Sequence, residues 1–312
     1  MLKKKWLFLP VAGIFLIGII IGSFLDLQIN QALYDRYNGF GIFFAAFGEF
    51  PVYSFLGVMA AGFVLLCKTY KKLWQRIALI VLALGCIGVS VYFQGKHIVS
   101  WNAYNRSDLL PLAFGIALFM VALAFVAGYF LFKYATIKPM QILIILLSIM
   151  VIYGIAIGLN QILKNVMCRP RSRFLFETET INSNYRDWWE RGKSVKDNWV
   201  KLLWPGTDVA ITTEEFKSFP SGHMANTMIL LPMFLFVPII NNHVKLKEEW
   251  IVIISVLWNL VLAYTRMRVG AHFLSDVCMG AFMTIVVTYA VNELFCFVYK
   301  KYGGEQEATQ QE

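Results

Sequence analysis

The sequence is poor in charged residues. Only 15% of its 312 residues are Asp, Glu, Lys or Arg, and 58% are hydrophobic, whereas a soluble domain carries about a quarter charged residues. This shortage excludes an ordinary water-soluble domain and indicates that lipid surrounds most of the surface. Several apolar runs reach the roughly 20 residues that cross a hydrocarbon core. In lipid such runs form helices, because each segment must satisfy its own backbone polar groups. We therefore expect an all-α, polytopic transmembrane bundle.

Cysteine is scarce as well. The five cysteines are an odd number, and they show neither the spacing of a zinc site nor that of a redox pair. We therefore expect no disulfide framework, no metal site and no cofactor. The chain is basic, with a formal net charge of +9, but much of this charge lies in short loops beside apolar runs. The bias of cytoplasmic loops towards Lys and Arg explains it, so we expect no nucleic-acid partner.

The apolar runs predict a bundle of six to eight spans. The N-terminal run is longer than the apolar core of a secretion signal and lacks an A-x-A-like cleavage site, so we expect it to remain as the first helix. Basic residues in the even-numbered connections and at both ends place both termini in the cytoplasm and the odd-numbered connections outside. We expect an integral protein of a bacterial plasma membrane. The eight runs are residues 6–25, 50–67, 76–94, 110–133, 140–163, 223–240, 250–266 and 272–298.

Two connections differ from simple loops. The segment 27–47 mixes polar and aromatic residues, which suits an interfacial stretch rather than a span. The fifth connection is far longer than an ordinary loop, and its insert at about 172–219 predicts a cap outside the cytoplasm. The cap holds four of the nine tryptophans, a residue that favours the headgroup region. They are Trp188, Trp189, Trp199 and Trp204.

The remaining organisation is simple. We expect one integral-membrane domain over residues 1–302, with its catalytic core at about 140–298. The polar tail, residues 303–312, lacks the apolar residues that a folded segment needs and is expected to be disordered.

Three groups of polar residues stand at the ends of predicted spans. The first is Lys164 with Arg169 and Arg171, where the fifth span leaves the membrane. A guanidinium offers a planar fork to phosphate oxygens, and Lys adds a compact charge. Taken alone, such a cluster is also typical of ordinary interfacial anchoring.

The second group is Pro220-Ser221-Gly222-His223, which opens the sixth span. A helix N-terminus has unpaired N–H groups and partial positive charge, which together suit a phosphate. Ser221 can cap the helix, and Gly222 permits close approach to the backbone. His223 titrates near neutrality and could protonate a leaving oxygen. A plain helix cap explains Pro, Ser and Gly but not a histidine at the edge of a bilayer.

The third group is Arg266, His272 and Asp276, between the seventh and eighth spans. The four-residue step from His272 to Asp276 puts both side chains on one helix face. A carboxylate there can bond one imidazole nitrogen and leave the other free to attack. An acidic residue just inside a span is costly and indicates function. All three groups fall on the same predicted outer face, which favours one shared site.

These motifs resemble the three signature motifs of the type 2 phosphatidic acid phosphatase superfamily, over about residues 164–276. The first family motif is Lys, six residues and Arg-Pro, so Arg171 matches while Ser172 replaces the proline; Arg169 is the reserve candidate. Thr265 replaces the serine that usually opens the third motif. The family core usually has about six spans, so eight implies two further helices near the N-terminus.

The resemblance implies a metal-independent membrane phosphatase. His272 would attack phosphorus and form a phosphohistidine, Asp276 would orient the ring, and His223 would protonate the leaving group. The implied substrate is a lipid phosphate or diphosphate, such as phosphatidate, phosphatidylglycerophosphate or undecaprenyl diphosphate. The alternatives are a phosphotransferase that passes phosphate to a lipid or sugar acceptor, and a catalytically silent transporter or scaffold. The implied phosphate ligands are Lys164, Arg171, Ser221, Gly222 and Arg266.

Overall fold

The computed structural model describes residues 5–100, 109–135, 137–192, 204–206, 211–240 and 247–303, and over these ranges it contains helices and no strand. Eight long or medium helices form the bundle, and short helical turns complete its ends. The helices of the bundle are α1 (Phe8–Leu33), α2 (Gly39–Phe47), α3 (Phe50–Leu66), α4 (Leu73–Ser100), α5 (Leu110–Lys133), α6 (Pro139–Met167), α11 (Glu248–Arg268) and α12 (Leu274–Gly303). The short elements are η1 (Lys5–Leu7), α7 (Ser172–Glu177), α8 (Ile181–Asn184), η4 (Thr213–Phe216), α9 (Gly222–Thr227), η5 (Met228–Phe236) and α10 (Val237–Ile240).

The prediction of a polytopic all-helical membrane protein is confirmed. Seven helical segments of the described chain are long and apolar enough to cross a membrane. The run expected as the sixth span, residues 223–240, is instead built from α9, η5 and α10, of which Gly222–Phe236 forms a shorter apolar segment. Pro232 lies inside η5, and a proline removes a backbone donor and interrupts the α-helical ladder.

The stretch 27–47 differs from the interfacial segment expected from sequence. α1 continues through it to Leu33, and α2 runs on into α3 as a single candidate span, Gly39–Leu66. The polar residues Asp26 and Asn30 on α1 are buried against other parts of the chain. Their partners are therefore protein groups, which allows the first helix to extend about two turns further than hydropathy indicates.

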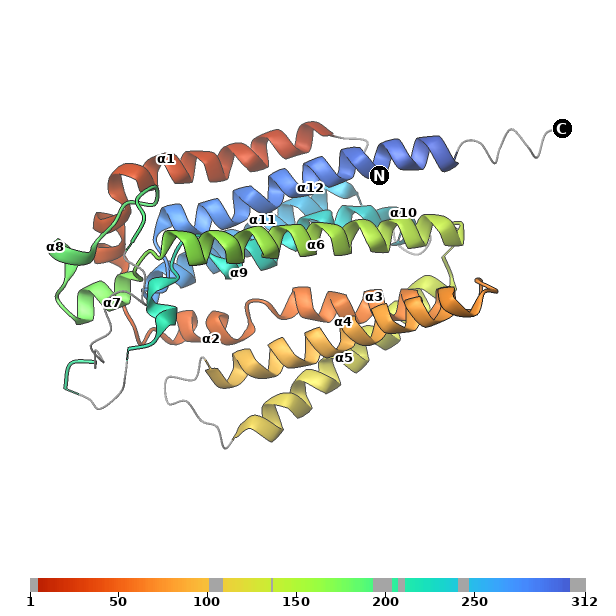
Figure 1. The fold of residues 1–312 in the computed structure, drawn as a ribbon, viewed down its shortest axis with the longest axis horizontal. Helices are drawn as coiled ribbons and strands as arrows, with labels where there is room; N and C mark the ends of the chain where they lie inside the picture. The colour runs from red at the N-terminus through yellow and green to blue at the C-terminus, as the bar shows by residue number, and fades with distance from the viewer. Residues whose placement is uncertain are drawn as a thin grey trace.

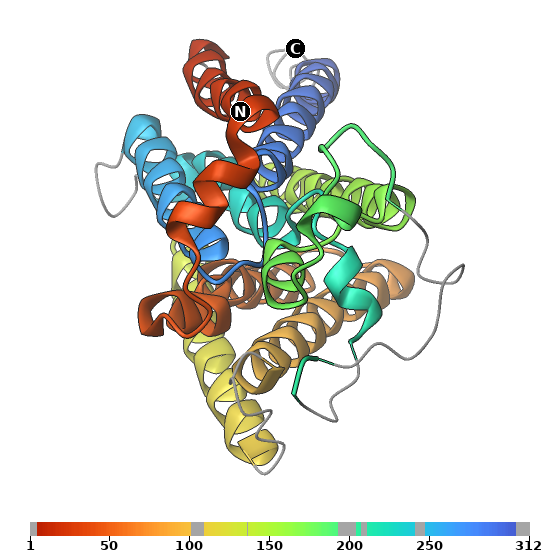
Figure 2. The same cartoon turned by 90° about the vertical axis from the view of Figure 1, so that its left-hand side faces the viewer.

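The bundle has one end where the short elements gather (Figure 1). α2, α7 and α8 lie there, together with the end of α1 and the starts of α9 and α12, whereas the start of α1 and the end of α12 lie at the opposite end. α1 packs along α12, and α3, α4 and α5 pack against one another. Figure 2 looks onto the first end and shows the short green and teal elements lying across the ends of the long helices.

The cap contains an apolar cluster of its own. Phe174 and Leu175 on α7 pack with Ile211 and with Phe273, which precedes α12. Trp188 stacks on Phe219 and donates its indole N–H to Ser23 on α1 at 2.9 Å. These contacts fix the described part of the cap to the bundle. Trp199 and tail residues 304–312 lie outside the described residues.

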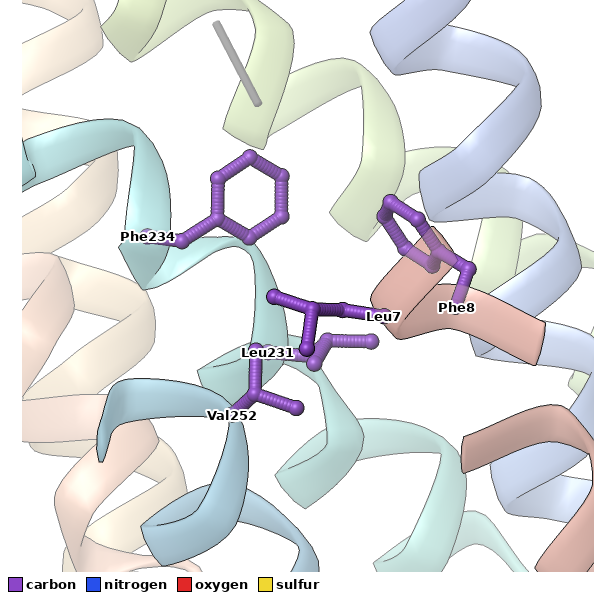
Figure 3. A pocket seen from close by; sticks show the side chains of 5 residues that line it. All are labelled: Leu7, Phe8, Leu231, Phe234 and Val252. Carbon is purple, nitrogen blue, oxygen red and sulfur yellow. The ribbon is translucent and has the colours of Figure 1, made fainter. Parts of the chain in front are cut away.

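An apolar hollow lies near the opposite end of the bundle (Figure 3). It is lined by Leu7 and Phe8 at the start of α1, by Leu231 and Phe234 on η5, and by Val252 on α11. Phe8 is 18 residues before Asp26 on the same helix, a rise of about 27 Å. The hollow has an apolar lining and is remote from the three motifs, so it does not form part of the candidate site.

Candidate active site

α9, which opens with the second motif, is held among the helices that carry the other two. It packs against α6, α11 and α12. Asn160 on α6 donates its side-chain N–H to the carbonyls of Pro220 and Ser221, each at 3.3 Å. A Cβ on Gly280 of α12 would lie only 2.4 Å from the Ser221 oxygen. Glycine at that position therefore permits α12 to approach the second motif closely.

Lys164 lies in the last turn of α6, directly against the second motif. Its side chain is buried and donates to the carbonyl of Lys217 at 2.8 Å. A Cβ built on Gly222 would meet the Lys164 Cε at 3.4 Å. The first and second motifs are therefore in contact, as expected for a shared phosphate site.

Arg169 occupies a different place from the phosphate-facing position considered for it. Its side chain is 1% exposed and makes ion pairs with Asp26 on α1 at 2.9 Å and with Asp276 on α12 at 2.6 Å. It also donates to Ser275 at 2.8 Å. Two buried carboxylates neutralise this guanidinium, so Arg169 holds α1, α12 and the loop after α6 together.

Arg171 is less completely neutralised. Its Nε donates to the carbonyl of Glu214 at 2.8 Å, and its guanidinium lies 3.9 Å from the exposed carboxylate of that residue. The neighbouring Arg173 is instead paired with the buried Glu215. Among the three arginines of this loop, Arg171 has the weakest carboxylate partner, which favours it as the phosphate ligand of the first motif.

Ser221 caps α9. Its backbone N–H donates to the carbonyl of Asp276 at 2.9 Å, and its side-chain oxygen accepts a long bond from the Met224 N–H at 3.5 Å. The residue has non-helical backbone angles typical of an N-cap. The third motif therefore helps to position the start of the second.

The turn from α11 to α12 sets the separation of Arg266 and His272. Gly270 adopts φ +65°, a conformation that favours glycine, and the N–H of Ala271 donates to the carbonyl of Arg266 at 3.0 Å. A Cβ on Gly270 would lie 2.5 Å from Tyr34 and 2.7 Å from Arg173. This glycine therefore satisfies both the backbone conformation and the close packing.

The ring of His272 is held by a backbone carbonyl. Its Nδ1 lies 2.7 Å from the carbonyl oxygen of Ser218. A carbonyl oxygen only accepts hydrogen bonds, so in the neutral ring the proton is on Nδ1 and the lone pair is on Nε2. The ring therefore presents Nε2 as its nucleophilic atom.

Asp276 does not make the direct bond to the imidazole that the sequence suggested. One carboxylate oxygen pairs with Arg169, and the other accepts the Phe273 N–H at 2.8 Å and the Ser218 hydroxyl at 2.5 Å. The bond to Phe273 is that of a carboxylate in the first turn of a helix reaching back to the N-cap. Asp276 therefore reaches His272 through Ser218, whose hydroxyl it accepts and whose carbonyl holds the ring.

Electrostatics agree with an unprotonated ring. Burial and then the nearby cations Lys164, Arg171 and Arg266 hold the pKa of His272 well below its ordinary value. The imidazole is therefore neutral at pH 7, the form that a nucleophile requires.

Several residues around the motifs were missed by the sequence reasoning. Asn160 inside a predicted span gave a signal, because polar groups within spans are costly. Ser218 gave none, since it stands in a polar stretch, and Asp26 and Glu49 lie next to the ends of predicted apolar runs, where a charged residue is ordinary. The second histidine, His223, faces Glu49, which belongs to none of the three motifs. Tyr53 and His97 lie beside this carboxylate.

The fold and site define an integral-membrane protein whose three cationic and histidine motifs meet at one end of the bundle. The chain belongs to the PAP2 superfamily, whose family model matches residues 141–299. The match runs from α6 into α12 and includes all three motifs, and it assigns the chain to a family of phosphatase-type enzymes acting on lipid phosphates. Comparisons with curated proteins and with solved structures gave no significant match.

Proposed function

We propose that the protein hydrolyses a lipid phosphate or diphosphate monoester through a phosphohistidine at His272. The observation that carries this proposal is the 2.7 Å contact between Nδ1 of His272 and the Ser218 carbonyl. This contact leaves Nε2 as the attacking atom in a site surrounded by cations. The contact forms without a bound substrate.

The cationic groups supply the phosphate site. Lys164, Arg171 and Arg266 neutralise the negative charge that the phosphoryl oxygens carry, and this term dominates catalysis of phosphoryl transfer. The Ser221 hydroxyl and the Gly222 backbone N–H add neutral donors. In this scheme these side chains perform the charge neutralisation that a metal provides in other phosphatases.

The reaction has two steps. Nε2 of His272 bonds to phosphorus as the bond to the leaving oxygen breaks, and that oxygen takes a proton from His223. Water then attacks the phosphohistidine and gives a proton to His223 as the phosphorus–nitrogen bond breaks. For a monoester the products are an alcohol and inorganic phosphate, and both histidines return to their initial state.

The position of the site supports a lipid substrate. The proposed catalytic groups lie at helix ends, where a headgroup of a membrane lipid is within reach. Phosphatidate, phosphatidylglycerophosphate and a polyprenyl diphosphate fit this description. The bias of basic residues in the connections supports an active site on the outer side of a bacterial plasma membrane. We assign the activity to one domain over residues 1–302, with its core at about 140–298.

The experiment is a phosphate-release assay on purified protein with vesicles that contain each of these three lipids. We expect release from at least one lipid and none from His272→Ala, which should insert and express normally. Adding lipid and sugar acceptors and analysing the products separates hydrolysis from transfer. The proposal fails if no lipid releases phosphate or if His272→Ala retains normal turnover.

A further inference from the structure

A buried cluster from the first half of the chain meets His223. Glu49 stands at the junction of α2 and α3 and is 5% exposed. One carboxylate oxygen lies 2.8 Å from His97 Nε2 on α4 and accepts the Tyr53 hydroxyl at 2.8 Å. The other lies 3.8 Å from Nδ1 of His223. Glu49, Tyr53 and His97, here the Glu49 cluster, all lie outside the residues matched by the superfamily.

The cluster is joined to α9 at more than one point. Asn226, almost one turn after His223, donates to the Tyr53 hydroxyl at 2.9 Å. The rings of His97 and His223 meet edge to face with centroids 5.4 Å apart. The two carboxylate oxygens of Glu49 therefore face different histidines, and both the ring and the helix of His223 are held by the cluster.

The charges around His223 make this carboxylate important. A general acid must carry its proton when the substrate is bound, yet neighbouring cations disfavour the imidazolium form and an anion favours it. Glu49 is the carboxylate that opposes these cations. The charged or titratable groups that act on His223 are Glu49, His97, Arg171 and Arg266, with His272 and Lys164 in the same site.

We propose that Glu49 and His97 are positioning residues that hold His223 as the proton donor of the reaction, a role that rests on the proposed function. Glu49 attracts the Nδ1–H of His223 and so favours the imidazolium form, in which Nε2 also carries a proton, the one passed to the leaving oxygen. His97 and Tyr53 hold the carboxylate in place with their own hydrogen bonds. Residues on helices outside the range matched by the superfamily thus help to position His223 as the catalytic acid.

The same atoms raise a metal-site alternative. The ligand atoms of Glu49, His97 and His223 all lie within 4.8 Å of one another, which a divalent cation could bridge. Such an ion would add positive charge next to Lys164, Arg171 and Arg266, and Glu49 already accepts bonds from protein donors. We therefore favour the proton-donor role, and metal analysis belongs in its test.

The test compares leaving groups. Two phosphate monoesters are presented in the same detergent micelles, one with an alkyl alcohol and one with a nitrophenol as leaving group. The alkoxide needs a proton as it departs, whereas the nitrophenolate leaves without one. Because kcat/KM reports the steps up to phosphoenzyme formation, the comparison isolates the role of the acid.

For Glu49→Gln we expect kcat/KM to fall about 10- to 100-fold on the alkyl ester and much less on the aryl ester. The alkaline limb of the pH profile should move to lower pH, because the acid loses the anion that favours its protonated form. His97→Asn should show the same selectivity with a smaller loss. Glu190→Gln, at an exposed cap residue, is the matched control and should leave both rates unchanged.

Three results overturn the proposal. The first is an equal loss on both esters in folded Glu49→Gln and His97→Asn proteins, which is the sign of a structural role. The second is an unchanged alkyl rate in both. The third is a stoichiometric metal in the purified protein that Glu49→Gln removes. Failure of the proposed function differs from all three, because it appears as no phosphate release from any lipid or as normal turnover by His272→Ala.

Discussion

Nδ1 of His272 lies 2.7 Å from the carbonyl oxygen of Ser218, whose hydroxyl bonds Asp276. The ring is thus oriented by a backbone carbonyl. The Asp276 carboxylate acts on the ring indirectly, through Ser218. This order of contacts separates two functions, since the carbonyl sets the tautomer of the ring while Asp276 fixes the loop that carries the carbonyl.

Ser218→Ala tests this separation. The variant keeps the carbonyl and removes only the hydroxyl that Asp276 accepts. We expect kcat to fall by about tenfold, far less than the loss of a nucleophile. Steady-state kinetics beside His272→Ala measures the difference. A loss as complete as that of His272→Ala would show that the hydroxyl takes part in the chemistry.

Arg169 and Arg171 should respond differently to neutral substitution. Arg169→Gln leaves Asp26 and Asp276 buried without their cation, so we expect the free energy of unfolding to fall by about 3–5 kcal/mol. Arg171→Gln should keep normal stability but lower kcat/KM about 100-fold, because it removes a phosphate ligand. Thermal unfolding and activity are measured on both. A stable but inactive Arg169→Gln protein would reverse the assignment.

Gly270→Ala tests the turn that places His272. A side chain at φ +65° is strained by about 1–2 kcal/mol, and here it would also strike Tyr34 and Arg173. Gly206→Ala is the control, because Gly206 has φ +72° but no atom of the described residues within 4 Å of the added Cβ. We expect Gly270→Ala to lose more stability than the control, and activity as well. Equal effects would mean that the packing around Gly270 is unimportant.

The pH dependence should reflect the low pKa of His272. The attacking ring must be neutral, and burial with nearby cations holds its pKa well below the ordinary value. The acid limb of kcat/KM should therefore lie below about 6.5, the ordinary pKa of histidine. Removing a cation in Arg171→Gln should move this limb to higher pH. An acid limb that does not move would argue against His272 as the group that titrates.

Much of the fold could be predicted from the sequence, because each span can be recognised from its own run of apolar residues. The motif residues were also accessible, because an aspartate inside a predicted span is costly and the three polar groups fall on one predicted face. The ends of α1 and the roles of Asp26 and Glu49 were not accessible. Each of these carboxylates is buried by partners on distant helices, such as Arg169 and His97, and a local pattern does not report a distant partner.

The prediction for Asp276 failed for a related reason. Its four-residue spacing from His272 is correct for a shared helix face, but His272 stands before α12 begins. The carboxylate instead accepts hydrogen bonds from the Phe273 N–H at the start of the helix and from Arg169. Spacing indicates proximity, whereas the choice of hydrogen-bond partner depends on the loop that carries Ser218.

The central claim is tested most directly by trapping the phosphoenzyme. The protein is mixed briefly with a ³²P-labelled lipid phosphate, quenched in alkali and mapped by mass spectrometry. We predict an acid-labile, alkali-stable phosphoryl group on His272. Label on another residue, or turnover in His272→Ala with no label on any histidine, would contradict the mechanism.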